Sequence, residues 1–147
     1  MVRRGLTSTP PAPWPSVVLD SEGLWAVARN SSEDARAVLA ASRQAGAPVL
    51  VPTVVLAETL IGDERDARVY QTLKKLQVVP LDETIARMAA RLKRLTGMAG
   101  VAATIDAVVT ATSAAAGGGV ILTSDIEDIR TLADRVTAGI RVRPIGI

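Results

Sequence analysis

The sequence predicts an α/β domain in three layers, with a central, mainly parallel sheet of four or five strands and helices on both faces. Short apolar runs of β character alternate along the chain with segments of helical periodicity, as in βαβ units. The length of 147 residues suits one domain with a substantial core. The chain is 48% hydrophobic and 22% charged, which is typical of a globular protein.

Five short runs rich in valine, isoleucine and leucine are the expected strands. They cover residues 17–20, 48–51, 78–80, 120–123 and 141–145. Residues 1–16 precede the first of them and contain four prolines, so we expect a flexible or extended tail there. The single domain is expected at 17–147.

Helices are expected between these strands. Residues 31–46 offer Ser31 or Ser32 as N-cap and Gly46 as stop, and residues 63–77 place apolar side chains on one side. Residues 82–97 show the clearest helical spacing, with Gly97 at the end and an apolar stripe of Ile85, Met88, Ala89, Leu92 and Leu95. Glycines 117–119 are interpreted as the turn from a helix into the fourth strand.

The chain has no histidine and no cysteine, and this restricts its chemistry. Disulfides, thiolate nucleophiles, cysteine zinc sites, Ser-His-Asp catalysis and most imidazole-based metal sites are excluded. Carboxylates, hydroxyls, lysine and arginine remain. A bound metal should therefore be a hard, oxygen-preferring cation such as Mg²⁺ or Mn²⁺. The net charge of +2 neither indicates nor excludes a nucleic-acid partner.

Four acids stand at unusual positions. Asp20 directly follows the first predicted strand, and Asp125 directly follows the fourth. Glu58 lies in the apolar segment 51–62, and Asp106 lies near the start of the apolar helix 102–116. Taken singly, Asp20 and Asp125 could be helix N-caps, Asp106 a first-turn acid favoured by the helix dipole, and Glu58 a surface residue.

Taken together, the four acids indicate a cation site. Asp20 and Asp125 occupy the carboxyl ends of predicted parallel strands, which is where open α/β sheets bind ligands. Several carboxylates in one place repel each other unless their pKa values shift or a cation joins them. A divalent cation resolves that repulsion and can promote phosphodiester hydrolysis.

From about residue 17 to 145, the chain resembles the PIN-domain ribonucleases, particularly VapC-type toxins of toxin–antitoxin systems. The blocks that carry the resemblance are VVLDSEGLWAVA, VPTVVLAETLIG, VVPLDETIARMAARLKRLTG and TIDAVVTATSAAAGGGVILTSDIEDI. The resemblance implies a PIN-like fold and an acidic metal site of Asp20, Glu58, Asp106 and Asp125. Asp128 matches a position where some members carry a further acid.

The chain departs from the family pattern at two places. Glu22 stands where a small hydroxyl residue is often found, two positions after the first acid. Ala103 stands where a serine N-cap is common, and Thr104 is a possible substitute. Glu22 affects the expected local geometry and substrate approach rather than metal binding.

The expected function is that of a Mg²⁺- or Mn²⁺-dependent endoribonuclease, the toxin of a type II toxin–antitoxin system. Asp20 and Asp106 would be the principal ligands, and Glu58 and Asp125 would complete the site. Three hydroxyls could orient water or phosphate, or simply cap the backbone: Ser21, Thr123 and Ser124. Arg87 and Arg91 lie opposite the apolar stripe of helix 82–97. They are interpreted either as an RNA-contacting patch or as an ordinary solvated face.

The resemblance also implies a homodimer and a protein antitoxin that inserts a segment near the acidic site. A cytoplasmic location is expected, because the longest charge-free stretch, 107–124, contains Thr, Ser and three glycines and suits no membrane span. The main alternative is a non-catalytic PIN-like interaction module. A glycosidase fits poorly because the chain has so few aromatic residues. A receiver domain also fits poorly, because the chain has no adjacent acid pair after the first predicted strand and no lysine after the last one.

Overall fold

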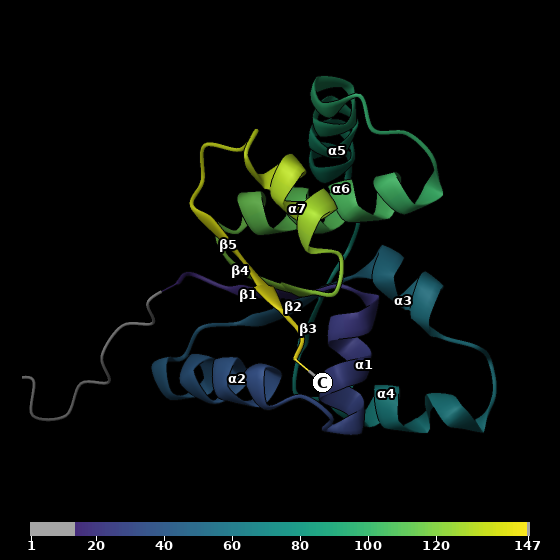
Figure 1. Cartoon of the computed structure of the whole chain (residues 1–147). Coiled ribbons are helices and arrows are strands. Elements are labelled where there is room, and N and C mark those ends of the chain that lie inside the picture. The colour runs from purple at the N-terminus through teal and green to yellow at the C-terminus, as the bar shows by residue number, and fades with distance from the viewer. Residues whose placement is uncertain (1–13, 147) are drawn as a thin grey trace, which may run out of the picture.

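A five-stranded, all-parallel sheet organises residues 14–146, the part of the chain that the computed structural model describes (Figure 1). The strand order is β3-β2-β1-β4-β5, so Val18 of the central strand pairs with Leu50 on one side and Ile121 on the other. The strands are β1 (Val17–Leu19), β2 (Val49–Pro52), β3 (Gln77–Val79), β4 (Gly119–Thr123) and β5 (Ile140–Pro144). All five predicted strands are confirmed, each end within one residue.

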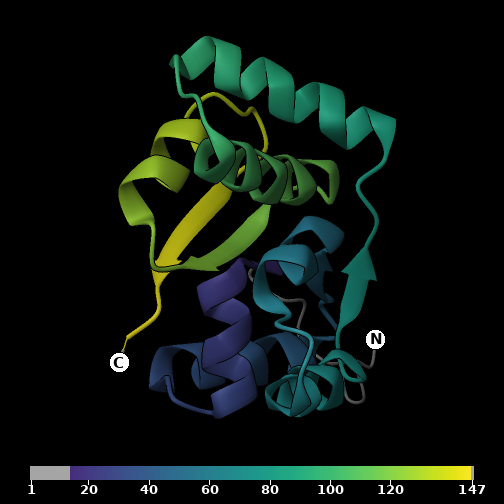
Figure 2. The same cartoon turned by 90° about the vertical axis from the view of Figure 1, so that its right-hand side faces the viewer.

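Helices cover both faces of the sheet, which confirms the predicted three layers. Figures 1 and 2 show α6 and α7 on one face, with α5 outside α6, and α1, α2 and α4 on the other. The helices are α1 (Ser21–Arg29), α2 (Glu33–Ala45), α3 (Thr53–Thr59), α4 (Ala67–Leu73), α5 (Glu83–Thr96), α6 (Val101–Ala115), α7 (Ile126–Ala133) and the 3₁₀ turn η1 (Glu64–Asp66).

The hydrophobic core has two parts. The larger lies around β1, whose three residues are completely buried with Leu24 of α1 and Val109 of α6. Burial on both faces explains why β1 reads as a continuous apolar run rather than an alternating one. The smaller part joins α5, α6 and α7, and its buried members are Ile85, Ala89, Leu92, Ala107, Val108, Ala111 and Leu132.

Side-chain caps fix several helix ends. Ser32 caps α2 by accepting from the backbone N–H of Ala35 at 3.0 Å, and Gly46 ends that helix in the left-handed conformation. Asp82 caps α5 in the same way through Ile85, at 2.8 Å, and Gly97 ends it. The predicted stops at both glycines are therefore confirmed.

Segment 63–77 is not the single helix predicted from its sequence. It divides into η1 and the short helix α4, which ends at Leu73. Tyr70 is 55% exposed, so the apolar residues of this segment are not all on a buried side, and Val69 is the buried residue of α4. The reason is Asp66: its buried carboxylate accepts the backbone N–H groups of Ile61 and Gly62, so it holds the preceding loop instead of opening a long helix. Leu95 of the predicted α5 stripe is also exposed.

The glycine triplet forms the predicted turn between α6 and β4. Gly118 and Gly119 have φ of 91° and 133°, and a Cβ at Gly119 would lie 2.1 Å from the carbonyl oxygen of Ser16. The chain there has no space for a side chain. The predicted tail falls largely outside the described residues, but Trp14 packs against the domain and its Nε1 donates to Ser42 Oγ at 3.0 Å.

The junction between α5 and α6 is a sharp bend at residues 97–100, after which the two helices pack against each other. Within residues 14–146, no single helix has the length and apolar character to cross a membrane. Only α5 and α6 taken jointly reach that length and composition, and they are bent by 120°.

Candidate metal centre

The four predicted acids meet in one cavity at the carboxyl edge of the sheet. This acidic cavity, of about 340 Å³, is lined by Asp20, Glu58, Asp106 and Asp125. They come from the β1–α1 junction, α3, α6 and the β4–α7 junction, which are brought together because β4 pairs directly with β1. No lysine or arginine is among its described lining residues. The cavity therefore concentrates negative charge.

Asp20 is both a helix cap and a cavity residue. One carboxylate oxygen, Oδ1, accepts from the backbone N–H of Gly23 at 2.8 Å, and Oδ2 accepts from the hydroxyl of Thr123. Burial raises the pKa of Asp20 to about 6, although both hydrogen bonds lower it, and the charges of Glu22 and Glu58 raise it further. The two interpretations of Asp20 are thus compatible.

Asp106 is the most perturbed acid of the cavity. It is the sixth residue of α6, in the second turn, because the helix begins at Val101; the first-turn dipole interpretation is therefore wrong. It is 7% exposed, and its Oδ2 has no hydrogen-bond partner within residues 14–146. Burial, a hydrogen bond with Asp125 and the charges of Asp125, Asp20 and Asp128 raise its pKa to about 8.

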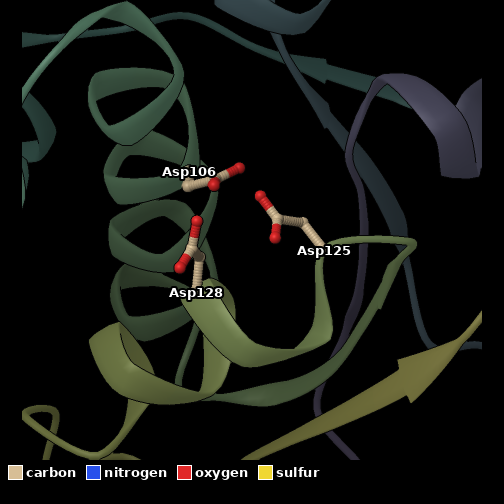
Figure 3. A group of neighbouring side chains, drawn as sticks. All are labelled: Asp106, Asp125 and Asp128. Carbon is tan, nitrogen blue, oxygen red and sulfur yellow. The ribbon is translucent and has the colours of Figure 1, made fainter.

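Asp125 and Asp128 face Asp106 across the gap between α6 and the start of α7 (Figure 3). One oxygen from each of the three carboxylates lies within 4.8 Å of the others. Asp125 occupies the N-cap position of α7, but its side chain makes no capping hydrogen bond. Its backbone N–H instead donates to Thr123 Oγ1 at 2.8 Å. The Asp125 carboxylate therefore lines the acidic cavity without capping α7.

Two further acids stand at the rim. Glu58 is exposed in the last turn of α3, and its Oε1 accepts the hydroxyl hydrogen of Ser21. Glu22, which sequence reasoning left without a role, lines the same cavity and is exposed. The signal that could have placed it is its position two residues after Asp20, in the first turn of a helix that starts at the cavity.

The predicted substrate-contacting residues have different locations. Ser21 and Ser124 line the acidic cavity, whereas Thr123 is completely buried and its hydroxyl binds Asp20 and the Asp125 N–H. Arg87 and Arg91 lie on α5 and do not line the acidic cavity. Arg87 is engaged locally, since its Nε donates to Glu83 Oε2 at 2.7 Å.

These residues fit a hard divalent cation. All the ionisable groups that line the acidic cavity are carboxylates, whose oxygens such cations prefer. A buried oxygen of Asp106 without a partner is costly in an apolar setting and would be compensated by a cation. Burial first, and then the charges of neighbouring carboxylates, raise the pKa values of Asp20 and Asp106.

Comparison with known proteins identifies the family and the fold. The model of the PIN domain family matches residues 17–134. No curated protein matches the chain by sequence. The fold is similar to chains in three solved complexes: VapBC2 from Rickettsia felis bound to a promoter DNA fragment, DNA-bound VapBC from Salmonella typhimurium, and VapBC-5, a toxin–antitoxin system of Mycobacterium tuberculosis.

The three similarities extend over almost the whole chain. The TM-scores are 0.65, 0.64 and 0.53, with sequence identities of 12%, 17% and 20%. The alignments cover 87%, 89% and 90% of this chain, and 97%, 98% and 99% of the respective solved chains. At these identities the likeness establishes a shared fold.

Proposed function

The chain belongs to the PIN domain family, and from this premise we propose that it is an endoribonuclease that depends on Mg²⁺ or Mn²⁺. One observation carries the proposal. The buried Asp106 carboxylate, with an oxygen that has no partner within residues 14–146, faces Asp125 and Asp128 in a cavity lined by acids. Such an arrangement suits cation-dependent hydrolysis of a phosphodiester. Catalysis by a side-chain nucleophile fits less well, because the chain has no histidine or cysteine.

The cation would be held by Asp20 and Asp106, with Asp125 and Glu58 completing the site and Asp128 close by. When bound, it supplies positive charge that activates water and stabilises the charge developing on the phosphate. Each oxygen of Asp20 is fixed by a hydrogen bond, so its remaining lone pairs point in set directions. Ser21 orients Glu58 at the rim.

The residues of this chain also control the protons in the site. Asp106 is mostly protonated at neutral pH in the absence of a cation, because its pKa lies at about 8. Burial and the neighbouring Asp125 carboxyl favour the protonated form of Asp106. A cation would displace the proton, so cation binding and proton release are linked at Asp106.

The proposed biological role is that of a toxin inhibited by a cognate protein antitoxin. The support is the family membership, together with fold similarity to chains of VapBC complexes, one of which is described as a member of the VapBC family of toxin–antitoxin systems. We propose further that the protein acts on RNA in the cytoplasm and forms a homodimer. Co-purification with a small neighbour-encoded protein checks the antitoxin, and a dimeric mass in solution checks the homodimer.

The nuclease proposal is tested with Asp106→Asn, and Asp134→Asn serves as the matched control on the exposed end of α7. Wild type and the control should cleave single-stranded RNA in Mg²⁺, and Asp106→Asn should not, with its fold intact by circular dichroism. Cleavage in excess chelator, or full activity of Asp106→Asn, would refute the proposal. Failure of the wild type to bind Mn²⁺ in calorimetry would favour the non-catalytic interaction module.

A further inference from the structure

A second groove borders the acidic cavity on the side of α1. This Trp25 groove, of about 640 Å³, lies between α1 and the segment from the α3–η1 loop to α4. Trp25 lines both the groove and the acidic cavity, so the two are adjacent. Three arginines line the groove, Arg29, Arg65 and Arg68, and its acid is Glu64. The groove and the cavity therefore present opposite charge side by side.

The acidic cavity alone is poorly suited to hold RNA. Its described lining contains no cation, while every phosphate that flanks a scissile bond carries a negative charge. Phosphate contacts from arginine and lysine are what normally position a nucleic acid on a protein. The arginines of the Trp25 groove are the basic residues that border the cavity through a shared lining residue, whereas Arg87 and Arg91 line neither space.

Two of the three groove arginines are available for a ligand. Within residues 14–146, no hydrogen bond or ion pair engages the guanidinium of Arg29 or of Arg68. Arg65 is different, because Asp63 accepts from its guanidinium at 2.6 Å in a two-oxygen pair. The Arg29 guanidinium lies over the Trp25 ring, 4.4 Å from its centroid. Such stacking holds the group in place while its in-plane N–H donors remain free for a phosphate.

The far wall of the groove is held in place before any ligand binds. Asp66, 3% exposed, accepts from the backbone N–H of Gly62 at 2.7 Å and from that of Ile61 at 3.0 and 3.1 Å. These bonds order the loop that carries Ile61, a lining residue of the groove whose side chain is largely exposed. A preformed wall reduces the ordering that a ligand must impose on the protein.

We propose that the Trp25 groove binds the single-stranded RNA that flanks the scissile phosphodiester, with Arg29 and Arg68 contacting its phosphates. The inference rests on the proposed nuclease function, since it assigns a path to that enzyme's substrate. Trp25 itself is no base-stacking platform, because its ring packs against the core and Arg29 covers it. The groove should accordingly recognise the RNA backbone and discriminate little between bases.

The test compares two double variants that each lose two positive charges. Arg29→Gln with Arg68→Gln removes the groove cations, and Arg87→Gln with Arg91→Gln is the matched control on α5. Binding of a labelled single-stranded RNA of about ten nucleotides is measured by fluorescence anisotropy over a series of salt concentrations, in an Asp106→Asn background that does not cleave. The groove variant should lower the salt slope of log K by about 1.4, since each phosphate contact contributes about 0.7 for single strands. The control should lower it clearly less.

A second readout relies on the groove lying beside the acidic cavity and not within it, so that a long RNA reaches both and a dinucleotide reaches the cavity alone. In the active protein, the groove variant should cleave a long RNA with reduced kcat/KM and a dinucleotide at the wild-type rate. Arg29→Lys keeps the charge but not the planar stack, so its salt slope should stay near that of wild type. Thermal melts of each variant establish that the fold is intact.

The outcomes separate this inference from the nuclease proposal. Reduced RNA binding by the groove variant supports the inference even if the wild type cleaves nothing, a result that would refute only the nuclease. Unchanged binding and cleavage of long RNA would overturn the inference while the nuclease stands. It would likewise be overturned by an equal loss in the Arg87 and Arg91 control, or by loss of a protein partner with RNA binding unchanged.

Discussion

Replacing Asp106 by asparagine is expected to stabilise the metal-free protein while removing its response to Mg²⁺. The Asp106 carboxyl is buried beside Asp125 and Asp128, and its pKa lies at about 8. Asparagine has nearly the same shape, can donate a hydrogen bond to Asp125 and carries no charge. The substitution therefore removes an unfavourable electrostatic contribution that the wild type carries whenever no cation is present.

The size of this effect depends on pH in a defined direction. Because the pKa of Asp106 rises from 3.8 to about 8 on folding, the folded state binds more protons than the unfolded state between these values. Stability therefore falls as pH rises from about 4 to about 8. The contribution of Asp106 to this fall has an upper limit of about 4 kcal/mol at pH 7 and about 2 kcal/mol at pH 5. Water in the open cavity screens the charges, so we expect about half of each.

Urea unfolding at the two pH values measures the effect. In chelator at pH 7, Asp106→Asn should have a free energy of unfolding about 2 kcal/mol higher than the wild type, and the difference should shrink at pH 5. Mg²⁺ at a hundredfold excess over its Kd should then stabilise the wild type by about 2.7 kcal/mol and leave the variant unchanged. Asp134→Asn should behave as the wild type throughout.

The reasoning would be refuted by an Asp106→Asn variant that is less stable than the wild type in chelator at pH 7. A stability difference that does not change between pH 5 and pH 7 would refute it as well. Either result would mean that burial and the neighbouring carboxylates do not raise the pKa of Asp106 in the folded protein.

Three further predictions concern the surroundings of the site. Thr123→Val should raise the pKa of Asp20 above about 6, because it removes a hydrogen bond that lowers this pKa in the wild type. Carbon-detected NMR titration of the carboxyl measures the change, and an unchanged pKa would contradict the assigned bond. Gly119→Ala should lower the free energy of unfolding by about 3 kcal/mol or more, since its Cβ would lie 2.1 Å from a Ser16 backbone atom at a φ of 133°. In urea unfolding, a loss below about 1 kcal/mol would show that the turn can shift. Mg²⁺ affinity measured by calorimetry should rise with pH between 5 and 8, as protons leave Asp20 and Asp106; a constant affinity would argue against both as ligands.

The sheet and its layers could be predicted because each strand is a short apolar run separated from the next by helical spacing. Burial on both faces of β1 gives the continuous run Val17, Val18 and Leu19, and glycines at helix ends mark where helices stop. The interruption at segment 63–77 could not be predicted in this way. It depends on the Asp66 carboxylate, which bonds back to the backbone N–H groups four and five residues before it, whereas its position alone suggests an ordinary first-turn acid.

The candidate site could be predicted only in part from the sequence, for a related reason. The sequence indicated which acids stand at strand ends, but not which carboxylates are used as caps. Asp20 caps α1 and still lines the cavity, whereas Asp125 occupies a cap position without capping. The adjacency of Trp25 to the acids depends on how α1 packs beside α3 and α4, which no local pattern records.

The pairing of β4 with β1 has a consequence for biosynthesis. Asp20 is made early and Asp125 more than one hundred residues later, and only β4 at the side of β1 brings them together. A chain still emerging from the ribosome therefore holds an incomplete set of acids until nearly the whole domain has been translated. A fragment that ends before β4 would carry Asp20, Glu58 and Asp106 but neither Asp125 nor Asp128, and it would lack the strand that places those two acids beside Asp20.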